Sequence, residues 1–246
     1  MKSNLSLSIA APAFNEAAGI REVICKWYHY LKKQNDITQF EIVICNDGSE
    51  DNTGAILDEL AKEYPEVKPL HFKRNQGAAV ALAAAIQATQ LDWVLLTDSD
   101  NQFPIDNLSI MLAKLHGTDA NAIIGIRRKK DHFFARVGSK ASGFICNKVH
   151  GTNIRDFNSA FKLIKGSLLR SFKLETKGMN CSTEMTSRLA ESKIPMLEVD
   201  IEHQARETGK SSLKWPQDAI HRFLFVCYIA LRQLLIKMGT LRRPYE

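Results

Sequence analysis

The sequence predicts an α/β protein, with a mostly parallel sheet covered by helices on both faces. Short apolar segments, which suit buried strands, alternate with longer segments whose apolar residues recur every three or four positions, which suit helices. The alternation repeats four times between residues 5 and 104, with short connections. Strands joined through helices in this way run parallel and form a sheet with both faces covered.

The composition is that of an ordinary globular protein. The chain has 246 residues, of which 45% are hydrophobic and 24% are charged, enough to bury a full core. A formal charge of +6 favours an anionic partner and leaves phosphate, a membrane surface and nucleic acid open. Internal repeats and low-complexity segments are absent.

The first strand is predicted over residues 5–11, followed by an exit loop that starts at Pro12. A helix is predicted over residues 16–33, because its apolar residues share one helical face. These residues are Ile20, Val23, Ile24, Trp27 and Leu31.

Two further strand–helix units follow. Residues 40–45 suit a second strand, and Asp51 is the expected N-cap of a helix that runs to about Glu63. Residues 67–72 suit a third strand, which leads into an alanine-rich helix over residues 78–88.

The fourth strand begins at Trp93 and runs into three oxygen-bearing side chains, Asp98, Asp100 and Gln102. Alternate residues of an extended chain project to the same side. Two carboxylates and an amide oxygen suit Mg²⁺ or Mn²⁺, which takes its remaining ligands from water and phosphates. The competing interpretation is a polar turn, with Pro104 opening the next helix.

Polar residues also follow the other predicted strands. In parallel sheets, ligands bind outside the carboxyl ends of the strands. Each such residue alone is more typical of a turn or a helix cap, but their shared placement favours one binding rim. Neither a Gly-x-Gly-x-x-Gly nor a Walker A sequence is present, which argues against dinucleotide and P-loop chemistry. The rim residues are Asn15, Glu16, Asp47, Arg74 and Asp98.

Four motifs occur in order along the chain. They are Pro12-x-Phe14-Asn15-Glu16, Asn46-Asp47-Gly48-Ser49-x-Asp51-x-Thr53, Arg74-Asn75-x-Gly77 and Asp98-x-Asp100-x-Gln102, the last followed by Pro104. As an ordered set they resemble the inverting family-2 glycosyltransferases of GT-A fold. The similarity is greatest to the dolichyl- and polyprenyl-phosphate mannosyl- and glucosyltransferases, and it covers most of residues 5–212.

The resemblance implies that the first half of the chain binds a nucleotide-diphosphate sugar. It places Asp47 and Asp98 near the nucleoside, and it assigns the divalent metal to Asp98, Asp100 and Gln102, with Asp100 also catalytic. The donor-binding residues that it implies are Pro12, Phe14, Asn15, Glu16, Asp47, Asn75, Gly77, Asp98 and Ser99.

The second half resembles the same family less closely. A strand that ends at Arg127 resembles the family strand that supplies a catalytic-site arginine. Arg136 and Ser139, on the next helix, resemble the arginine and serine that contact the acceptor phosphate. A late segment with Arg206 and Ser211 resembles the family loop that closes over the donor and acceptor phosphates, and the resemblance implies a catalytic role for Arg206.

Departures from the family pattern occur at four positions. Asn46 replaces the usual acid of the second motif, which leaves the nucleobase open. Ala160 and Lys162 stand where Gly and Arg are usual, in a segment that reads Asp156-x-x-Ser159-Ala160-Phe161-Lys162. Ser212 replaces a usual Lys, whose charge Lys210 or Lys214 is able to supply.

Elementary chemistry agrees with this interpretation. A sugar that leaves a nucleoside diphosphate builds negative charge on the β-phosphate, which a divalent ion and arginines stabilise. Arg127 is favoured because it directly follows a predicted strand, whereas residues 128–130 are favoured as a solvated basic face. The second half offers positive charge at Arg127, Arg128, Arg136, Lys140 and Arg206.

Residues 218–238 predict an amphipathic helix. Its polar half carries Asp218, His221, Arg222, Arg232, Gln233 and Lys237. The apolar half carries Ile220, Phe223, Leu224, Cys227, Leu231, Leu234 and Leu235. One interpretation is a helix packed on the core. The other is a helix lying in the membrane interface, with its basic edge and Arg242 and Arg243 toward anionic lipid.

Five cysteines lie far apart, without a Cys-x-x-Cys pair, which favours a reducing, cytosolic environment. Residues 5–11 alternate with serine and are too few for a signal peptide. No stretch approaches the roughly 18 to 20 apolar residues of a spanning helix. We expect a cytoplasmic protein, peripheral at the cytosolic face of a membrane, with no nucleic-acid partner.

The expected organisation is a GT-A domain over residues 1–213, with a donor half to about residue 104 and an acceptor half after it. Residues 214–246 form the C-terminal helical part. The predicted reaction is metal-dependent, inverting transfer of a hexose to a polyprenyl phosphate. The donor stays open among GDP-mannose, UDP-glucose and a UDP-N-acetylhexosamine.

Two alternatives to this reaction stay open. The first transfers to a sugar hydroxyl and needs a general base, for which Glu184 in Ser182-Thr183-Glu184-Met185 is the candidate by resemblance. Family members that use a hydroxyl acceptor usually carry a paired Glu-Asp there, and this chain has only one acid. A phosphate acceptor has a second pKa near 6, so at neutral pH it is largely ionised and needs no base. The second alternative is a non-catalytic nucleotide-sugar-binding relative.

Overall fold

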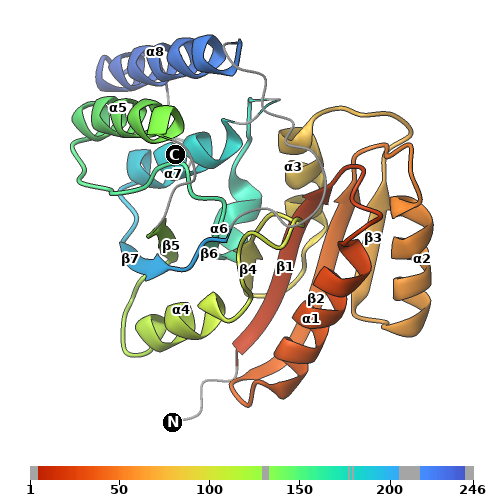
Figure 1. Ribbon diagram of the computed structural model, residues 1–246. Helices are drawn as coiled ribbons and strands as arrows, with labels where there is room; N and C mark the ends of the chain where they lie inside the picture. Colours follow the sequence, from red (N-terminus) through yellow and green to blue (C-terminus); the bar gives the residue numbers. More distant parts are fainter. Residues whose placement is uncertain (1–4, 129–132, 177, 179, 205–216, 242–246) are drawn as a thin grey trace.

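The protein is an α/β structure built on one seven-stranded sheet (Figure 1). The computed structural model describes residues 5–128, 133–176, 178, 180–204 and 217–241, with the side chains of 133–139, 217–220 and 222 outside the description. The strand order is β3-β2-β1-β4-β6-β5-β7. The strands are β1 (Leu5–Ala13), β2 (Ile37–Asn46), β3 (Val67–His71), β4 (Trp93–Leu96), β5 (Ala122–Arg127), β6 (Lys162–Lys165) and β7 (Met196–Ile201).

Eight helices are described between and after these strands. They are α1 (Ile20–Lys33), α2 (Thr53–Glu63), α3 (Ala78–Ala88), α4 (Asn107–Leu115), α5 (Phe133–His150), α6 (Gly166–Ser171), α7 (Cys181–Glu191) and α8 (Gln217–Lys237). The predicted alternation of strands and helices is therefore confirmed. Of the described strands, only β6 is antiparallel to its neighbours, β4 and β5.

Several predicted boundaries were wrong by a few residues. Helix α1 begins at Ile20 rather than at residue 16, because turns occupy the preceding positions. Helix α2 begins at Thr53, with Asn52 rather than Asp51 at the N-cap position. The Asp51 carboxylate still accepts a hydrogen bond from the N–H of Thr53 at 2.9 Å. After Pro104, α4 begins only at Asn107.

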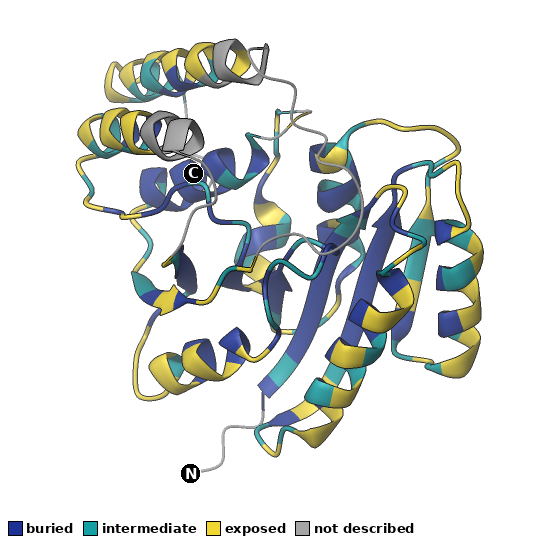
Figure 2. Cartoon of the chain, viewed as in Figure 1, coloured by how far each residue is buried: buried dark blue, intermediate teal, exposed yellow. Residues whose placement is uncertain are grey.

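The apolar residues of the strands alternate between two clusters, one on each face of the sheet. Ile9 of β1 and Leu95 of β4 pack with α1, α2 and α4, whereas Ala10 and Val94 pack with α3, α6 and α7. Figure 2 shows the buried strands between helices whose outer faces are exposed. All five predicted apolar residues of α1 are buried.

Helices α5, α7 and α8 pack against one another and against residues of β5 (Figure 1). Val226 and Ile229 of α8 are buried against Cys146 of α5 and Ala190 of α7. None of the described helices is both long enough and apolar enough to cross a bilayer.

The orientation of α8 differs from a simple core-packing helix. Most of its predicted apolar half faces away from the body, and Phe223, Leu224, Leu231 and Leu234 are all more than half exposed. Arg232, from the predicted polar half, points inward and bonds to Glu191 of α7. The helix therefore packs on the body by a narrow seam and presents apolar side chains to its surroundings.

Candidate active site

The carboxyl ends of the parallel strands meet at one edge of the sheet, as predicted. The register pairs Ala13 of β1 with Asn46 of β2, and Ala10 of β1 with Leu96 of β4. Consequently the loops that leave these three strands lie next to one another. The candidate donor and metal residues of the first half are carried by these loops.

The loops after β1 and β2 are held together by side chains of the first two motifs. The N–H of Asn15 donates to Ser49 Oγ, and the N–H of Glu50 donates to Asn15 Oδ1, both at 2.9 Å. The N–H of Glu16 donates to Thr53 Oγ1 at 2.9 Å. Asn15 has φ of +54°, a left-handed conformation that asparagine tolerates. The motif residues thus form one rigid corner beside the half-exposed ring of Phe14.

Asp47 fixes the next loop. Its buried carboxylate accepts hydrogen bonds from the N–H groups of Gln76 at 2.8 Å and Gly77 at 2.9 Å. Gly77 has φ of +101°, which only glycine adopts readily. A Cβ on Gly48 would lie 2.3 Å from the carbonyl carbon of Arg74, so the loops after β2 and β3 touch backbone to backbone. Both oxygens of Asp47 therefore serve to position the loop that carries Asn75.

Asn46, one of the four departures from the family pattern, has a structural role. Its Nδ2 donates to His71 Nδ1 at 3.1 Å, and its Oδ1 accepts from the N–H of Ser49 at 3.0 Å. Because an amide nitrogen only donates, His71 must carry its proton on Nε2, which contacts Asp58 Oδ1 at 3.1 Å. Asn46 therefore joins the ends of β2 and β3.

The segment after β4 is a turn rather than the extended chain predicted for Asp98, Asp100 and Gln102, because β4 ends at Leu96 and Asn101 has φ of +61°. The turn is anchored at both ends. Ser99 Oγ donates to the Pro12 carbonyl at 2.7 Å, and Asp100 Oδ1 accepts from the N–H of Gln102 at 3.1 Å. Gln102 exchanges two bonds with Gln204: its carbonyl accepts at 2.9 Å, and its Nε2 donates to the Gln204 carbonyl at 3.4 Å. The turn is thus tied to the β1 exit and to the segment after β7.

The donor atoms at this turn fit a Mg²⁺ or Mn²⁺ ion. They are two carboxylates and an amide oxygen, and Asp100 is 8% exposed with its orientation fixed by a backbone bond. Among the residues that the structure describes, no cluster of three or more His, Cys, Asp or Glu side chains forms a metal site. A site here would take few protein ligands and leave positions for phosphate oxygens, which is typical of Mg²⁺.

Arg127 lies at the same edge of the sheet, at the end of β5. Strands β4 and β5 are both antiparallel to β6, so they run parallel to each other. The Nε of Arg127 donates to Asp156 Oδ2 at 2.9 Å, and its Nη2 donates to Asp156 Oδ1 at 3.1 Å. The Asp156 side chain is fully buried, whereas that of Arg127 is 19% exposed.

Two residues of the site were not assigned a role from the sequence. Asp156 orients Arg127. Lys162, at the start of β6, is buried between β4, which precedes Asp98, and β5, which ends at Arg127. Both belong to the segment that resembles the family pattern. The available signal was an acidic and a basic residue six positions apart in one short segment without other charges.

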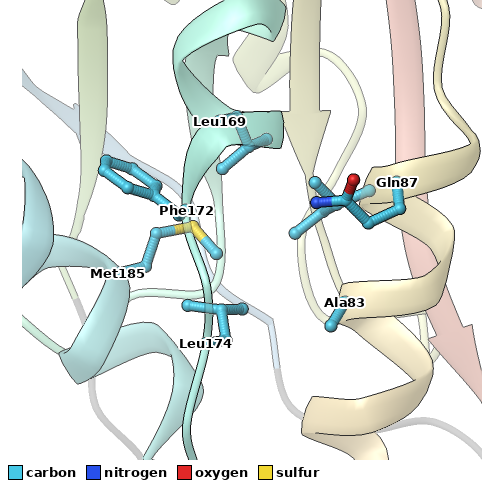
Figure 3. A pocket seen from close by; sticks show the side chains of 7 residues that line it. Ala83, Gln87, Leu169, Phe172, Leu174 and Met185 are labelled. Atoms are coloured by element: carbon cyan, nitrogen blue, oxygen red, sulfur yellow. The ribbon is translucent and has the colours of Figure 1, made fainter. Parts of the chain in front are cut away.

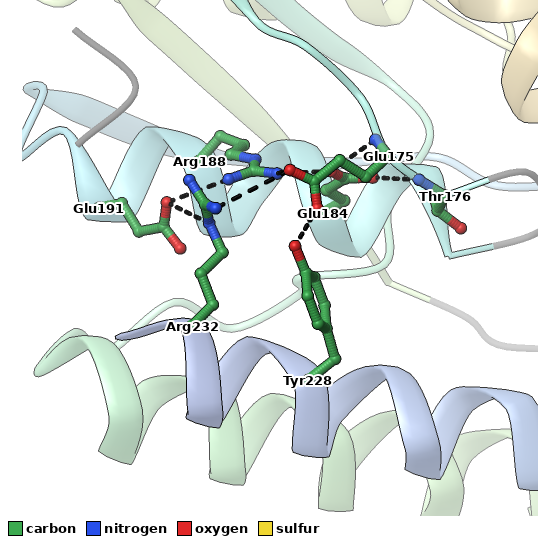
Figure 4. A network of polar contacts seen from close by, with 7 residues as sticks. All are labelled: Glu175, Thr176, Glu184, Arg188, Glu191, Tyr228 and Arg232. Atoms are coloured by element: carbon green, nitrogen blue, oxygen red, sulfur yellow. Dashed lines mark hydrogen bonds and ion pairs between the residues drawn. The ribbon is translucent and has the colours of Figure 1, made fainter. Parts of the chain in front are cut away.

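Glu184 is buried in a polar network on α7 (Figure 4). Its two carboxylate oxygens accept hydrogen bonds from the N–H groups of Glu175 and Thr176, each at 2.9 Å. Oε1 also accepts from Arg188 Nη2 at 3.0 Å. The carboxylate therefore holds the segment before α7 against the helix.

The remaining candidates fall where the structure gives no side chains. Arg136 and Ser139 lie on α5, but their side chains are outside the description. Arg206, Lys210, Ser211, Ser212 and Lys214 lie outside the described residues altogether. Their contacts with an acceptor phosphate stay predictions.

A small apolar cavity lies between α3 and the α6–α7 region, away from the rim (Figure 3). Its volume is about 10 Å³, which at most admits one water molecule. It is a packing gap rather than a substrate site. The lining residues are Ala83, Ile86, Gln87, Leu169, Phe172, Leu174 and Met185.

Residues 8–176 match the family described as "Glycosyl transferase family 2". The chain belongs to this family. Two curated relatives are similar to it. The dolichyl-phosphate beta-glucosyltransferase ALG5A of Trichomonas vaginalis is 29% identical, over 65% of this chain and 53% of that protein. The bactoprenol glucosyl transferase of Shigella phage SfX is 30% identical, over 69% of this chain and 55% of that protein. The chain thus spans about half the length of these relatives.

Solved structures confirm the expected fold of this family-2 chain. Mannosyl-3-phosphoglycerate synthase of Rubrobacter xylanophilus has a TM-score of 0.71 at 17% identity, over 97% of this chain and 76% of that one. Glucosyl-3-phosphoglycerate synthase of Mycobacterium tuberculosis, crystallised with Mn²⁺, UDP and glucosyl-3-phosphoglycerate, has a TM-score of 0.67 at 16% identity. That match covers 96% of this chain and 81% of the other.

Proposed function

We propose that this protein catalyses metal-dependent, inverting transfer of a hexose from a nucleotide-diphosphate sugar to a polyprenyl phosphate at the cytosolic face of a membrane. The observation that carries the proposal is the shared rim, where the acidic turn after β4 and Arg127 at the end of β5 lie at one edge of the sheet. The names of the two curated relatives support a polyprenyl phosphate acceptor. A structural neighbour that was crystallised with Mn²⁺ and UDP supports the donor and the metal.

The residues of the rim have distinct tasks in this reaction. Asp98, Asp100 and Gln102 would hold the divalent ion, which supplies Lewis-acid stabilisation of the leaving diphosphate. Arg127 adds fixed positive charge, because its two bonds to Asp156 leave the guanidinium little freedom. The corner at Asn15 and the loop held by Asp47 shape the nucleoside end of the site.

The environment of Glu184 supports a phosphate acceptor over a hydroxyl acceptor. A general base needs a lone pair directed at the incoming hydroxyl. Both oxygens of Glu184 instead accept backbone N–H groups, and the side chain is 2% exposed. A phosphate acceptor arrives largely ionised at neutral pH and needs positive charge, for which Arg127, Arg136 and Arg206, with Ser139 and Ser211, are the proposed residues.

The outer face of α8 supports binding to a lipid bilayer. Apolar residues that are more than half exposed gather there. On α5, which packs against α8, Phe144 is exposed too, and Lys140, Lys148 and Lys237 are exposed on the same two helices. Buried apolar area and attraction of cations to anionic lipid are the two terms that hold a helix at a membrane surface. The apolar residues that are more than half exposed are Phe223, Leu224, Leu231 and Leu234 of α8 and Met238 directly after it.

A donor screen tests the proposal. GDP-mannose, UDP-glucose and a UDP-N-acetylhexosamine are each incubated with the protein, with and without polyprenyl phosphate and Mg²⁺. Glycosylated lipid formed only with both additions supports the proposal. Transfer to a free sugar hydroxyl instead would favour a hydroxyl acceptor, and nucleotide binding without turnover would favour a non-catalytic relative.

A further inference from the structure

Lys162 is a fully buried lysine at the centre of the proposed site. It begins β6, where it pairs with Leu96 of β4 and with Ile124 of β5. These strands lead directly into Asp98 and Arg127, so Lys162 lies between the two halves of the rim. Its side chain is 1% exposed, and its Nζ donates a hydrogen bond to the carbonyl of Ser159.

A charge in this position is costly, and an apolar residue would fill a strand site without that cost. Removing an ammonium ion from water costs several kcal/mol unless opposite charge and hydrogen bonds compensate. Desolvation lowers the pKa of Lys162 to about 8, and the charges of Asp156 and Asp98 oppose that shift. The compensating acids are therefore the residue that orients Arg127 and the first residue of the metal-binding turn.

We propose that Lys162 is a positioning residue, the buried counter-charge that balances Asp98 and Asp156 and so keeps the rim able to accept an anionic diphosphate. This inference rests on the proposed function. Lys162 and Arg127 offset the charges of Asp98 and Asp156, which leaves the carboxylate of Asp100 for the divalent ion. Loss of the ammonium ion leaves one excess negative charge beside the diphosphate, which like-charge repulsion then disfavours.

Three substitutions separate charge from hydrogen bonding. Lys162→Arg keeps charge and a donor, Lys162→Gln keeps a donor without charge, and Lys162→Met removes both while filling the space. Lys68→Gln is the matched control, because Lys68 also pairs with a buried acid but lies on β3, far from β6 in the sheet. Its Nζ contacts the carboxylate of Glu41 at 2.6 Å. Binding of UDP and of GDP is measured by calorimetry with Mn²⁺, and Mn²⁺ alone is measured by electron paramagnetic resonance.

The proposal expects the Gln and Met variants to bind the nucleotide about tenfold more weakly, the size of one modest charge–charge interaction. Both should bind Mn²⁺ alone at least as tightly as the wild type, a pattern that general loosening of the fold does not produce. Lys162→Arg and Lys68→Gln should bind the nucleotide as the wild type does. If Lys162→Met does not fold, the Gln variant carries the test.

Wild-type nucleotide affinity in a folded Lys162→Gln variant would overturn the inference, because the hydrogen bond alone would then suffice. Parallel weakening of Mn²⁺ and nucleotide binding would overturn it too, since a structural role explains that result. Failure of the wild type to bind either nucleotide with Mn²⁺ would instead remove the proposed function, and the inference with it.

Discussion

Arg127 and Asp156 form a two-bond ion pair at the rim of the sheet, with Nε–Oδ2 at 2.9 Å and Nη2–Oδ1 at 3.1 Å. The carboxylate is fully buried, so it has no competing water, and it sets the plane of the guanidinium. Lysine at position 127 would keep the charge but cannot make two parallel bonds.

Arg127→Lys should therefore lower turnover by roughly a hundredfold, the scale of losing one fixed electrostatic stabiliser, with nucleotide binding much less affected. Steady-state kcat and calorimetric donor binding measure the two effects. Arg155→Lys is the control, because Arg155 pairs with Glu198 and Asp200 in an exposed position. Equal turnover of both variants would remove Arg127 from the proposed mechanism.

Activity should need Mg²⁺ or Mn²⁺, and Asp100→Ala should cost about tenfold to a thousandfold in turnover. The nearly buried carboxylate is held by the N–H of Gln102, so its loss removes both an oxygen ligand and a turn bond. Asp119→Ala, on an exposed loop, is the control. Full activity in the presence of EDTA, or of the Asp100→Ala variant, would show that the metal assignment is wrong.

The sheet and its rim were predictable because they depend on local patterns. Strand and helix periodicities fixed the order of elements, and parallel strands bring their exit loops to one edge. Strand β6 was not predicted, because the four residues from Lys162 to Lys165 carry too little pattern to show a reversed strand. Hydrophobic spacing alone does not indicate that a short segment inserts between β4 and β5.

The hydrogen-bond partners of the polar side chains could not be predicted from the sequence, because they depend on how the loops pack. Spacing showed that Asp47 and Glu184 were polar residues in notable places, but not that both accept pairs of backbone N–H groups. The amphipathic pattern of α8 showed which residues share a face. It did not show that Val226 and Ile229 are the seam and that Leu231 faces outward, since that depends on α5 and α7.

Membrane binding should depend on the outer face of α8 and not on its seam. Leu231→Gln with Leu234→Gln should reduce flotation with anionic liposomes, because each removes exposed apolar area, and should leave thermal stability nearly unchanged. Ile229→Gln, at a 2% exposed position, should destabilise the protein by about 2–4 kcal/mol. If the outer pair leaves flotation intact while the protein stays folded, the bilayer is not the partner of this face.

His150, a partly buried residue whose two ring nitrogens are fully buried, should make stability fall below neutral pH. Both ring nitrogens are buried without a hydrogen-bond partner among the described residues, and desolvation, helped by Lys237, lowers the pKa to about 4 from 6.5. Between these values the unfolded chain binds a proton that the folded chain does not, so stability falls as pH falls. At about pH 5 the loss is about 2 kcal/mol relative to neutral pH.

Urea unfolding at about pH 7.5 and pH 5 measures this contribution as a difference between variants. His150→Leu should lose less stability on acidification than the wild type, whatever other groups titrate. His116→Leu, at an exposed position, should follow the wild type. Equal acid sensitivity of His150→Leu and the wild type would show that His150 does not contribute.

The acceptor is tested at Glu184, because a hydroxyl acceptor requires a base and a phosphate acceptor does not. Glu184→Gln keeps the shape of the side chain but turns an amide NH₂ toward one of the N–H groups of Glu175 and Thr176. Loss of that bond should cost about 1–3 kcal/mol, seen as a melting temperature lower by roughly 2–10 °C. Turnover per folded molecule should stay close to that of the wild type.

Arg136→Ala is the companion variant, expected to retain donor binding and to lose transfer mainly through weaker use of the acceptor. Both variants are assayed with polyprenyl phosphate and with free sugar acceptors, beside circular dichroism and calorimetric donor binding. If Glu184→Gln stays folded, binds the donor and yet transfers to no acceptor, the carboxylate acts as a base. A sugar hydroxyl would then replace the lipid phosphate as the acceptor, and the hydrogen bonds from Glu175 and Thr176 would have to open during the reaction.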